Sequence, residues 1–287
     1  MQAALFAAGL GDVIRKIYLT RSYQVLSETT EPVKVICASH NPFASEIFRF
    51  HRNASNFIIY ELGHKYDEFL KKGLRALELD KAVVEFAGVK WEDRIAGKAS
   101  EGYVPQFDAP DTIDSTGHVI FQPFSGSLVS RTFSEKAIEQ VAGVLQDLPC
   151  KVYLITRSFV RMGVSGRLAH AEENARRFEG KNIVVMDHLS VPATLNLVKS
   201  CSAFVGSWSS LQQAAWFENK PVGVVYPNDW CDVVNRSDYA FGLERPDCFH
   251  SNFKSLDLEK LKTWLAQWVP APAPAPVPDV QSPPAAP

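Results

Sequence analysis

One stretch in the second half of the chain, Ile183–Pro227, most constrains the fold. It reads IVVMDHLSVPATLNLVKSCSAFVGSWSSLQQAAWFENKPVGVVYP. Three short apolar runs, Ile183–Met186, Ala203–Val205 and Val222–Val225, alternate with two segments whose apolar residues recur at helical spacing. This alternation is typical of β-α-β units, so the stretch predicts strands of a parallel sheet joined by helices.

The loop after Ala203–Val205 is the best-placed ligand site in this stretch. Parallel sheets bind ligands beyond the carboxyl ends of their strands, and this loop, Gly206-Ser207-Trp208-Ser209-Ser210, opens a predicted helix. Hydroxyls and free N–H groups at a helix N-terminus suit a phosphate. Serine is also a common helix cap, so phosphate binding and simple capping are both open for Ser207 and Ser209.

The same alternation extends over the rest of the chain. Further strands are predicted at Ala3–Ala8, Pro32–Ala38, Phe57–Glu61, His118–Phe121 and Lys151–Thr156. Helical spacing is found within residues 13–19, 42–48, 65–90, 134–145, 167–179 and 257–269. Residues 91–116 lose this periodicity and predict an irregular connection. We therefore expect an N-terminal domain of residues 1–116, a C-terminal domain of residues 117–269, and a disordered Pro/Ala tail of residues 270–287.

Composition excludes several classes of protein. A hydrophobic fraction of 46%, a charged fraction of 22% and a net charge of −2 are typical of a soluble globular protein, and they give no electrostatic reason to expect nucleic acid or a membrane as partner. The five scattered cysteines form no C-x-x-C pair, which favours reduced thiols and a cytoplasmic location. No signal peptide or membrane span is predicted.

The first predicted turn, Gly9-Leu10-Gly11-Asp12, separates a strand from a helix. It lacks the full G-x-G-x-x-G pattern of dinucleotide-binding folds. A glycine at position 11 lets the backbone approach a ligand closely. Asp12 is expected at the start of the helix, facing the space above the sheet; the alternative is that it only caps the helix.

Both halves thus open as strand, small-residue loop and helix, and the chain resembles GT-B glycosyltransferases, most closely the ADP-heptose:lipopolysaccharide heptosyltransferase family. Three places carry the resemblance: residues 9–14, Gln122–Leu145 and Leu189–Pro227. The resemblance implies an α/β fold of GT-B type, with two Rossmann-like domains that face a central cleft.

The resemblance also implies roles for single residues. Asp12 takes the place of the family's proposed catalytic base, Arg131 that of the basic residue that holds donor phosphate, and Phe133 that of a neighbouring aromatic. A surface ion pair of Arg131 with Glu135 is an equally open interpretation. The family's Asp-Thr-Gly and nearby His are replaced by Gly206–Leu211, without acid or histidine, which leaves the donor sugar and nucleotide open.

Glycosyl transfer requires a base for the acceptor hydroxyl and stabilisation of the departing diphosphate. No Asp-x-Asp metal loop lies at a strand end, and we interpret Asp108, Asp111 and Asp114 as solvent-exposed, so no metal or cofactor is expected. The donor and its phosphates are assigned to Gly11, Ser125, Gly126, Ser127, Arg131, Arg157, His188, Ser207, Ser209 and Ser210.

Three further side chains, one histidine and two tryptophans, each allow two interpretations. His40, on the acceptor side, is either an alternative base or a loop histidine without a catalytic role. Trp208 and Trp230 either stack on a base or sugar or are buried aromatics.

The sequence therefore predicts a metal-independent, inverting glycosyltransferase that uses a nucleotide-diphosphate sugar. The alternatives are a nucleotide-sugar epimerase of similar build, and a non-catalytic scaffold protein descended from a transferase. The acceptor is open among a glycan or lipid, a protein, a small molecule and a modified DNA base.

Overall fold

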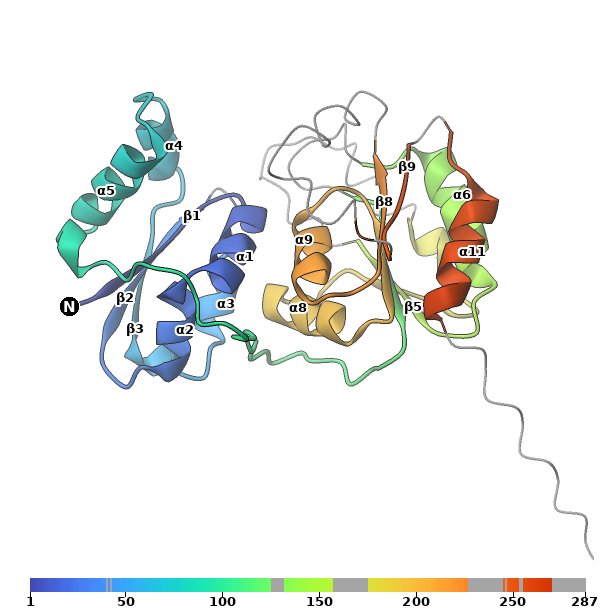
Figure 1. Cartoon of the computed structure of the whole chain (residues 1–287), viewed down its shortest axis with the longest axis horizontal. Coiled ribbons are helices and arrows are strands. Elements are labelled where there is room, and N and C mark those ends of the chain that lie inside the picture. Colours follow the sequence, from blue (N-terminus) through green and yellow to red (C-terminus); the bar gives the residue numbers. More distant parts are fainter. Residues whose placement is uncertain are drawn as a thin grey trace, which may run out of the picture.

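The computed structural model describes residues 1–39, 41, 43–124, 132–156, 175–226, 245, 247–252 and 255–269 (Figure 1). The C-terminal tail of residues 270–287 and most of the helix predicted over residues 167–179 lie outside this set. The described residues form an α/β structure with two parallel sheets, as the alternating apolar runs predict.

The N-terminal half is built on a three-stranded sheet in the order β1-β2-β3. The strands are β1 (Ala3–Ala8), β2 (Val33–Ser39) and β3 (Phe57–Glu61), all parallel, which confirms the three predicted strands. On one face lie α1 (Leu10–Leu19), α2 (Arg21–Glu28) and α3 (Glu46–Arg49). On the other lie α4 (Lys65–Leu70) and α5 (Ala76–Phe86) (Figure 1).

The C-terminal half holds a six-stranded sheet in the order β6-β5-β4-β7-β8-β9, all parallel. Its strands are β4 (Val119–Gln122), β5 (Val152–Ile155), β6 (Ile183–Met186), β7 (Ala203–Gly206), β8 (Val222–Tyr226) and β9 (Phe249–Asn252). Counted within this half, the order is 3-2-1-4-5-6, that of the doubly wound Rossmann fold. β9 was not predicted, because this edge strand has no run of apolar residues.

Helices cover both faces of the second sheet. α6 (Glu135–Gln146) and α11 (Leu258–Trp268) pack on one face, and α8 (Val191–Ser200) and α9 (Ser210–Phe217) on the face toward the N-terminal half (Figure 1). Residues 94–116 contain no helix or strand, as expected for residues 91–116, and β4 begins one residue later than the predicted His118. Short 3-10 turns lie at η1 (Ala54–Asn56), η2 (Trp91–Asp93) and η4 (Arg176–Phe178).

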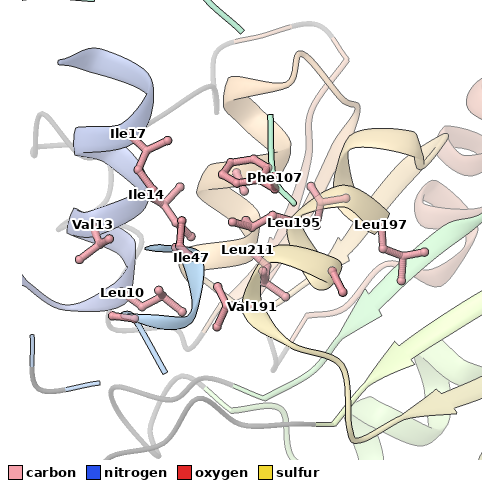
Figure 2. Close-up of a cluster of buried hydrophobic side chains, with 14 of the residues drawn as sticks. Leu10, Val13, Ile14, Ile17, Ile47, Phe107, Val191, Leu195, Leu197 and Leu211 are labelled. Carbon is pink, nitrogen blue, oxygen red and sulfur yellow. The ribbon is translucent and has the colours of Figure 1, made fainter. Parts of the chain in front are cut away.

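A single apolar core joins the two halves. Figure 2 shows Leu10, Ile14 and Ile17 of α1 beside side chains of α8 and α9, with Phe107 of the connecting segment in the same cluster. Because these residues are buried together, α1, α8 and α9 form a shared middle layer between the sheets. The division into domains at residues 116 and 117 stays a prediction, since the core runs across it.

Candidate functional site

The carboxyl ends of β4 and β7 form the centre of the candidate site. Chain order reverses between these adjacent strands, and ligands of open α/β sheets bind at such a switch point. Here the two backbones come very close, because a Cβ on Gly206 would lie 2.4 Å from the Gln122 carbonyl oxygen. The same oxygen accepts a hydrogen bond of 2.9 Å from the Ser207 N–H. Gly206 is therefore required for β7 to end against β4.

Two of the predicted phosphate-binding serines differ in their contacts. Ser209 is the N-cap of α9: its hydroxyl accepts from the Gln212 N–H at 3.2 Å and donates to Gln122 Oε1 at 2.5 Å. The Ser207 hydroxyl is fully buried and has no hydrogen-bond partner among the described residues. Capping thus accounts for Ser209 and leaves Ser207 unexplained.

A neighbouring glutamine is also unsatisfied. The Gln212 side chain is fully buried, and neither atom of its amide has a hydrogen-bond partner within the described residues. Burying a polar group without a partner costs about 1–3 kcal/mol. Ser207 and Gln212 together leave three side-chain polar atoms at the start of α9 buried and without a hydrogen-bond partner among the described residues.

The start of α1 carries Asp12. One carboxylate oxygen, Oδ2, accepts from the Gly9 N–H at 3.1 Å, so Asp12 caps the helix, as one of its two interpretations requires. Ala8, the last residue of β1, has a positive φ of 79°, a strained conformation for alanine. Oδ1 of the half-buried carboxylate makes no hydrogen bond to any described residue and is available for another role.

α1 and α9 lie side by side and point the same way. At their N-terminal ends, a Cβ on Gly11 would lie 3.2 Å from Oε1 of Gln213. At their C-terminal ends, the Tyr18 hydroxyl donates to Glu218 at 2.5 Å, and its ring stacks on Phe217 with 4.9 Å between centroids. The two N-termini, each with roughly half a positive charge, therefore meet at one place and favour an anion there.

Ionisable groups of α4 and α5 border Asp12. The Lys16 ammonium lies 3.7 Å from Asp80 of α5. Burial, followed by the charges of Asp80 and Asp12, raises the pKa of Tyr66 of α4 to about 12. Tyr66 is thus a neutral hydroxyl near the Asp12 carboxylate at ordinary pH.

The connecting segment contradicts one expectation. Asp111 is not solvent-exposed: it accepts from the Ser190 N–H at 2.7 Å and from the Ser190 hydroxyl at 2.5 Å. Glu46 of α3 accepts from the Val191 N–H at 2.8 Å. The N-terminus of α8 is thus bound by two carboxylates from the first half, an arrangement that composition could not reveal. Asp108 accepts from the Arg52 N–H at 2.9 Å, yet 39% of its side chain is exposed, and Asp114 is exposed as expected.

Other predicted residues lie apart from this centre. His188 follows the edge strand β6, is exposed, and lies 3.0 Å from Asp187. That hydrogen bond, followed by the charge of Arg176, holds the pKa of Asp187 below its usual range. Trp208 and Phe133 are both buried in the apolar core. Ser210 is half-buried and begins α9.

Several predicted residues lie outside the described set: His40, Ser125, Gly126, Ser127, Arg131, Arg157 and Trp230. Conversely, sequence reasoning missed Gln122, Gln212 and Gln213, because uncharged amides match no catalytic or ligand motif. Within the described residues, no group of three or more His, Cys, Asp or Glu side chains is arranged to hold a metal ion.

Comparison with solved structures identifies the fold. No protein-family model and no curated protein sequence matches the chain. It is similar to E. coli ADP-heptose LPS heptosyltransferase II, with a TM-score of 0.57, 12% identity, and coverage of 94% of this chain and 98% of that one. It is also similar to E. coli heptosyltransferase WaaC with ADP-2-deoxy-2-fluoro heptose, with a TM-score of 0.55, 12% identity, and coverage of 93% of this chain and 99% of that one.

A third similar structure is the family 9 glycosyl transferase from Veillonella parvula, with a TM-score of 0.52, 9% identity, and coverage of 92% and 88%. These similarities extend over nearly the whole of each chain. They confirm the resemblance at the level of fold: the chain has the GT-B type of α/β architecture, with two Rossmann-like halves that face each other.

Proposed function

We propose that this protein is a glycosyltransferase that moves a sugar from a nucleotide-diphosphate donor to an acceptor hydroxyl. The observation that carries the proposal is the meeting of the α1 and α9 N-termini at the β4–β7 switch point. Asp12 lies at the start of α1, and the unsatisfied Ser207 and Gln212 lie at the start of α9. The start of α1 can supply a base, and the start of α9 can bind an anion.

Each part would perform one half of the reaction. The free oxygen of Asp12 would accept the proton of the acceptor hydroxyl as the hydroxyl oxygen attacks the anomeric carbon. The α9 N-terminus and the Ser207 hydroxyl would stabilise the negative charge of the departing diphosphate. Attack from the side opposite the leaving group inverts the anomeric configuration.

The fold similarity supports the substrate class. Two of the similar structures are heptosyltransferase WaaC with ADP and with a fluorinated ADP-heptose, which makes a nucleotide-diphosphate sugar the natural first donor class to test. We propose that catalysis needs no metal, since helix N-termini and hydroxyls supply the stabilisation, together with Arg131. Arg131→Ala is then expected to weaken donor binding by roughly 1.5–3 kcal/mol.

The test is to incubate the protein with a panel of nucleotide-diphosphate sugars and acceptor extracts, and to measure release of nucleoside diphosphate with and without EDTA. Release that persists in EDTA supports the proposal. Interconversion of the sugar without an acceptor would instead indicate the epimerase, and donor binding without turnover would indicate the scaffold protein.

A pair of serine variants tests the anion site. Ser207→Ala should weaken binding of the cognate nucleoside diphosphate by roughly fivefold to tenfold in calorimetric titration, the equivalent of one hydrogen bond. Ser200→Ala is the matched control, because the Ser200 hydroxyl bonds only to carbonyl groups of its own helix. Equal affinities in the two variants would remove Ser207 from the site.

A further inference from the structure

The turn between α4 and α5 exposes several apolar side chains close together in the sequence. Every residue from Leu70 to Leu77 is exposed, and Leu70, Leu74 and Leu77 have exposed fractions of 43%, 36% and 68%. A single exposed leucine needs no explanation. Three within eight residues form an apolar patch, and such patches mark interaction surfaces.

Basic residues alternate with these leucines. Lys71, Lys72 and Arg75 lie between Leu70 and Leu77, and no acidic residue does. The first acid, Glu78, pairs with Arg75 at 2.9 Å, yet the Arg75 side chain is 88% exposed. The Lys72 ammonium lies 4.7 Å from the centre of the Phe69 ring. Residues 70–77 are therefore basic, between the acidic Glu68 and Glu78, although the whole chain carries a net charge of −2.

The helix that leads into the turn begins on the same side of the sheet as Asp12. α4 follows β3 and α1 follows β1, and because these strands are parallel, both helices begin at the same edge of the sheet. The Lys16–Asp80 contact of 3.7 Å joins α5 to α1 beside Asp12. Figure 1 shows the α4–α5 turn projecting from the top of the N-terminal half.

We infer that the α4–α5 turn docks on an anionic lipid bilayer: the three leucines enter the interfacial region, and Lys71, Lys72 and Arg75 bind lipid phosphates. Leucine beside basic residues is the composition of segments that lie in a membrane interface, and anionic headgroups attract such basic clusters. No described helix is long and apolar enough to cross a membrane. Docking of this kind is peripheral and reversible.

A second copy of the chain fits this surface less well. In a symmetric dimer the same patch would face itself, which would bring three positive side chains against three others. A bilayer surface with phosphate headgroups offers charges of the opposite sign and, just beneath them, an apolar region for the leucines.

Vesicle co-sedimentation tests the inference with the full chain. The protein should sediment with vesicles of equal parts phosphatidylglycerol and phosphatidylcholine and stay in solution with phosphatidylcholine alone. Leu74→Ser/Leu77→Ser should lower partitioning by at least about tenfold, and Lys71→Gln/Lys72→Gln by roughly tenfold or more. The assay contains no nucleotide sugar, so its outcome is independent of the proposed function.

Two variants elsewhere are matched controls. Leu19→Ser changes an exposed leucine at the C-terminal end of α1. Lys260→Gln/Lys262→Gln removes two exposed lysines of α11. Both variants should sediment with anionic vesicles like the unmodified protein. Thermal melting establishes that all variants fold. The inference is overturned if the protein stays in solution with anionic vesicles, or if the leucine variant partitions as strongly as the unmodified protein. It is also overturned if the protein forms a dimer without lipid and the leucine variant abolishes that dimer.

Discussion

The side-chain amide of Gln213 packs directly over the α-carbon of Gly11, so that a Cβ at position 11 would lie 3.2 Å from Oε1 and 3.3 Å from Nε2. This contact joins the first turn of α1 to the first turns of α9 across the two halves of the chain. The absence of a side chain at Gly11 permits the N-termini of α1 and α9 to lie close together. The coupling free energy between positions 11 and 213 can be measured.

A double-mutant cycle measures this contact. Alone, Gly11→Ala gains helix propensity of about 1 kcal/mol but forces the Gln213 amide to move. In a Gln213→Ala background the new methyl group meets no amide, so Gly11→Ala should be more favourable there by at least about 0.5 kcal/mol. Urea denaturation of the four proteins gives this coupling energy. A coupling energy near zero would mean that Gln213 does not restrict position 11.

The end of β7 should be the least tolerant position for a small added group. We expect Gly206→Ala to lower the free energy of unfolding by roughly 1–3 kcal/mol or more, because its Cβ would meet the Gln122 carbonyl oxygen at 2.4 Å and backbone must shift. Gly143→Ala is the control: this α6 glycine has open space around it, and alanine should stabilise the helix by about 0.5–1 kcal/mol. Chemical denaturation compares the two.

Buried thiols make the fold sensitive to alkaline pH. Burial raises the pKa of Cys37 and Cys201 to about 12 and that of Cys248 to about 11, from an ordinary value of 9.0. Above about pH 9 the unfolded chain loses thiol protons that the folded chain retains, so the free energy of unfolding falls with rising pH. Each thiol contributes a slope of up to about 1.4 kcal/mol per pH unit.

Urea denaturation in a reducing buffer, repeated between about pH 7 and pH 11, measures that slope. Cys37→Ala/Cys201→Ala removes the contributions of the two thiols whose pKa values are raised to about 12 and should give a shallower slope, whatever its stability at neutral pH. A slope equal to that of the unmodified protein would show that other groups, such as the buried Tyr18 and Tyr23, whose pKa values burial also raises, dominate.

The parts of the fold that were predictable are those where burial leaves a local pattern. β1 and β6 have the predicted bounds, because strands covered on both faces are continuous apolar runs. The edge strand β3 also has its predicted bounds, although none of its residues is fully buried. α2 was missed because its buried residues are only Ser22, Tyr23 and Leu26, too few to show a helical period. The Asp111–Ser190 contact was missed because it joins residues 79 positions apart.

The candidate site was predictable in its position but not in its composition. The doubly wound topology places the Gly206–Ser210 loop at the switch point, and that follows from the order of strands and helices. Gln122 and Ser209 lie 87 positions apart in the sequence, and only the β4–β7 register brings them together. A buried glutamine without a hydrogen-bond partner, such as Gln212, has no sequence signature, because a glutamine on the surface looks the same in the sequence.

Asp12 provides the sharpest test of the proposed chemistry. Its Oδ2 accepts the Gly9 N–H at 3.1 Å, a bond that the amide oxygen of asparagine can also accept, so Asp12→Asn should retain the cap. Loss of the charge at the helix N-terminus costs about 0.3–1 kcal/mol. An amide is a far poorer base than a carboxylate, so turnover should fall by at least about a hundredfold while donor affinity is kept.

Asp80→Asn is the matched control for Asp12→Asn, since Asp80 is a nearby carboxylate that pairs with Lys16 at 3.7 Å and has no proposed role in the chemistry. Turnover of Asp80→Asn should stay close to that of the unmodified protein. Initial rates of nucleoside diphosphate release, measured with melting temperatures for both variants, separate the two possible roles of Asp12. If Asp12→Asn turns over normally, the base lies elsewhere, with His40 the next residue to test; if it loses several kcal/mol of stability, Asp12 is structural.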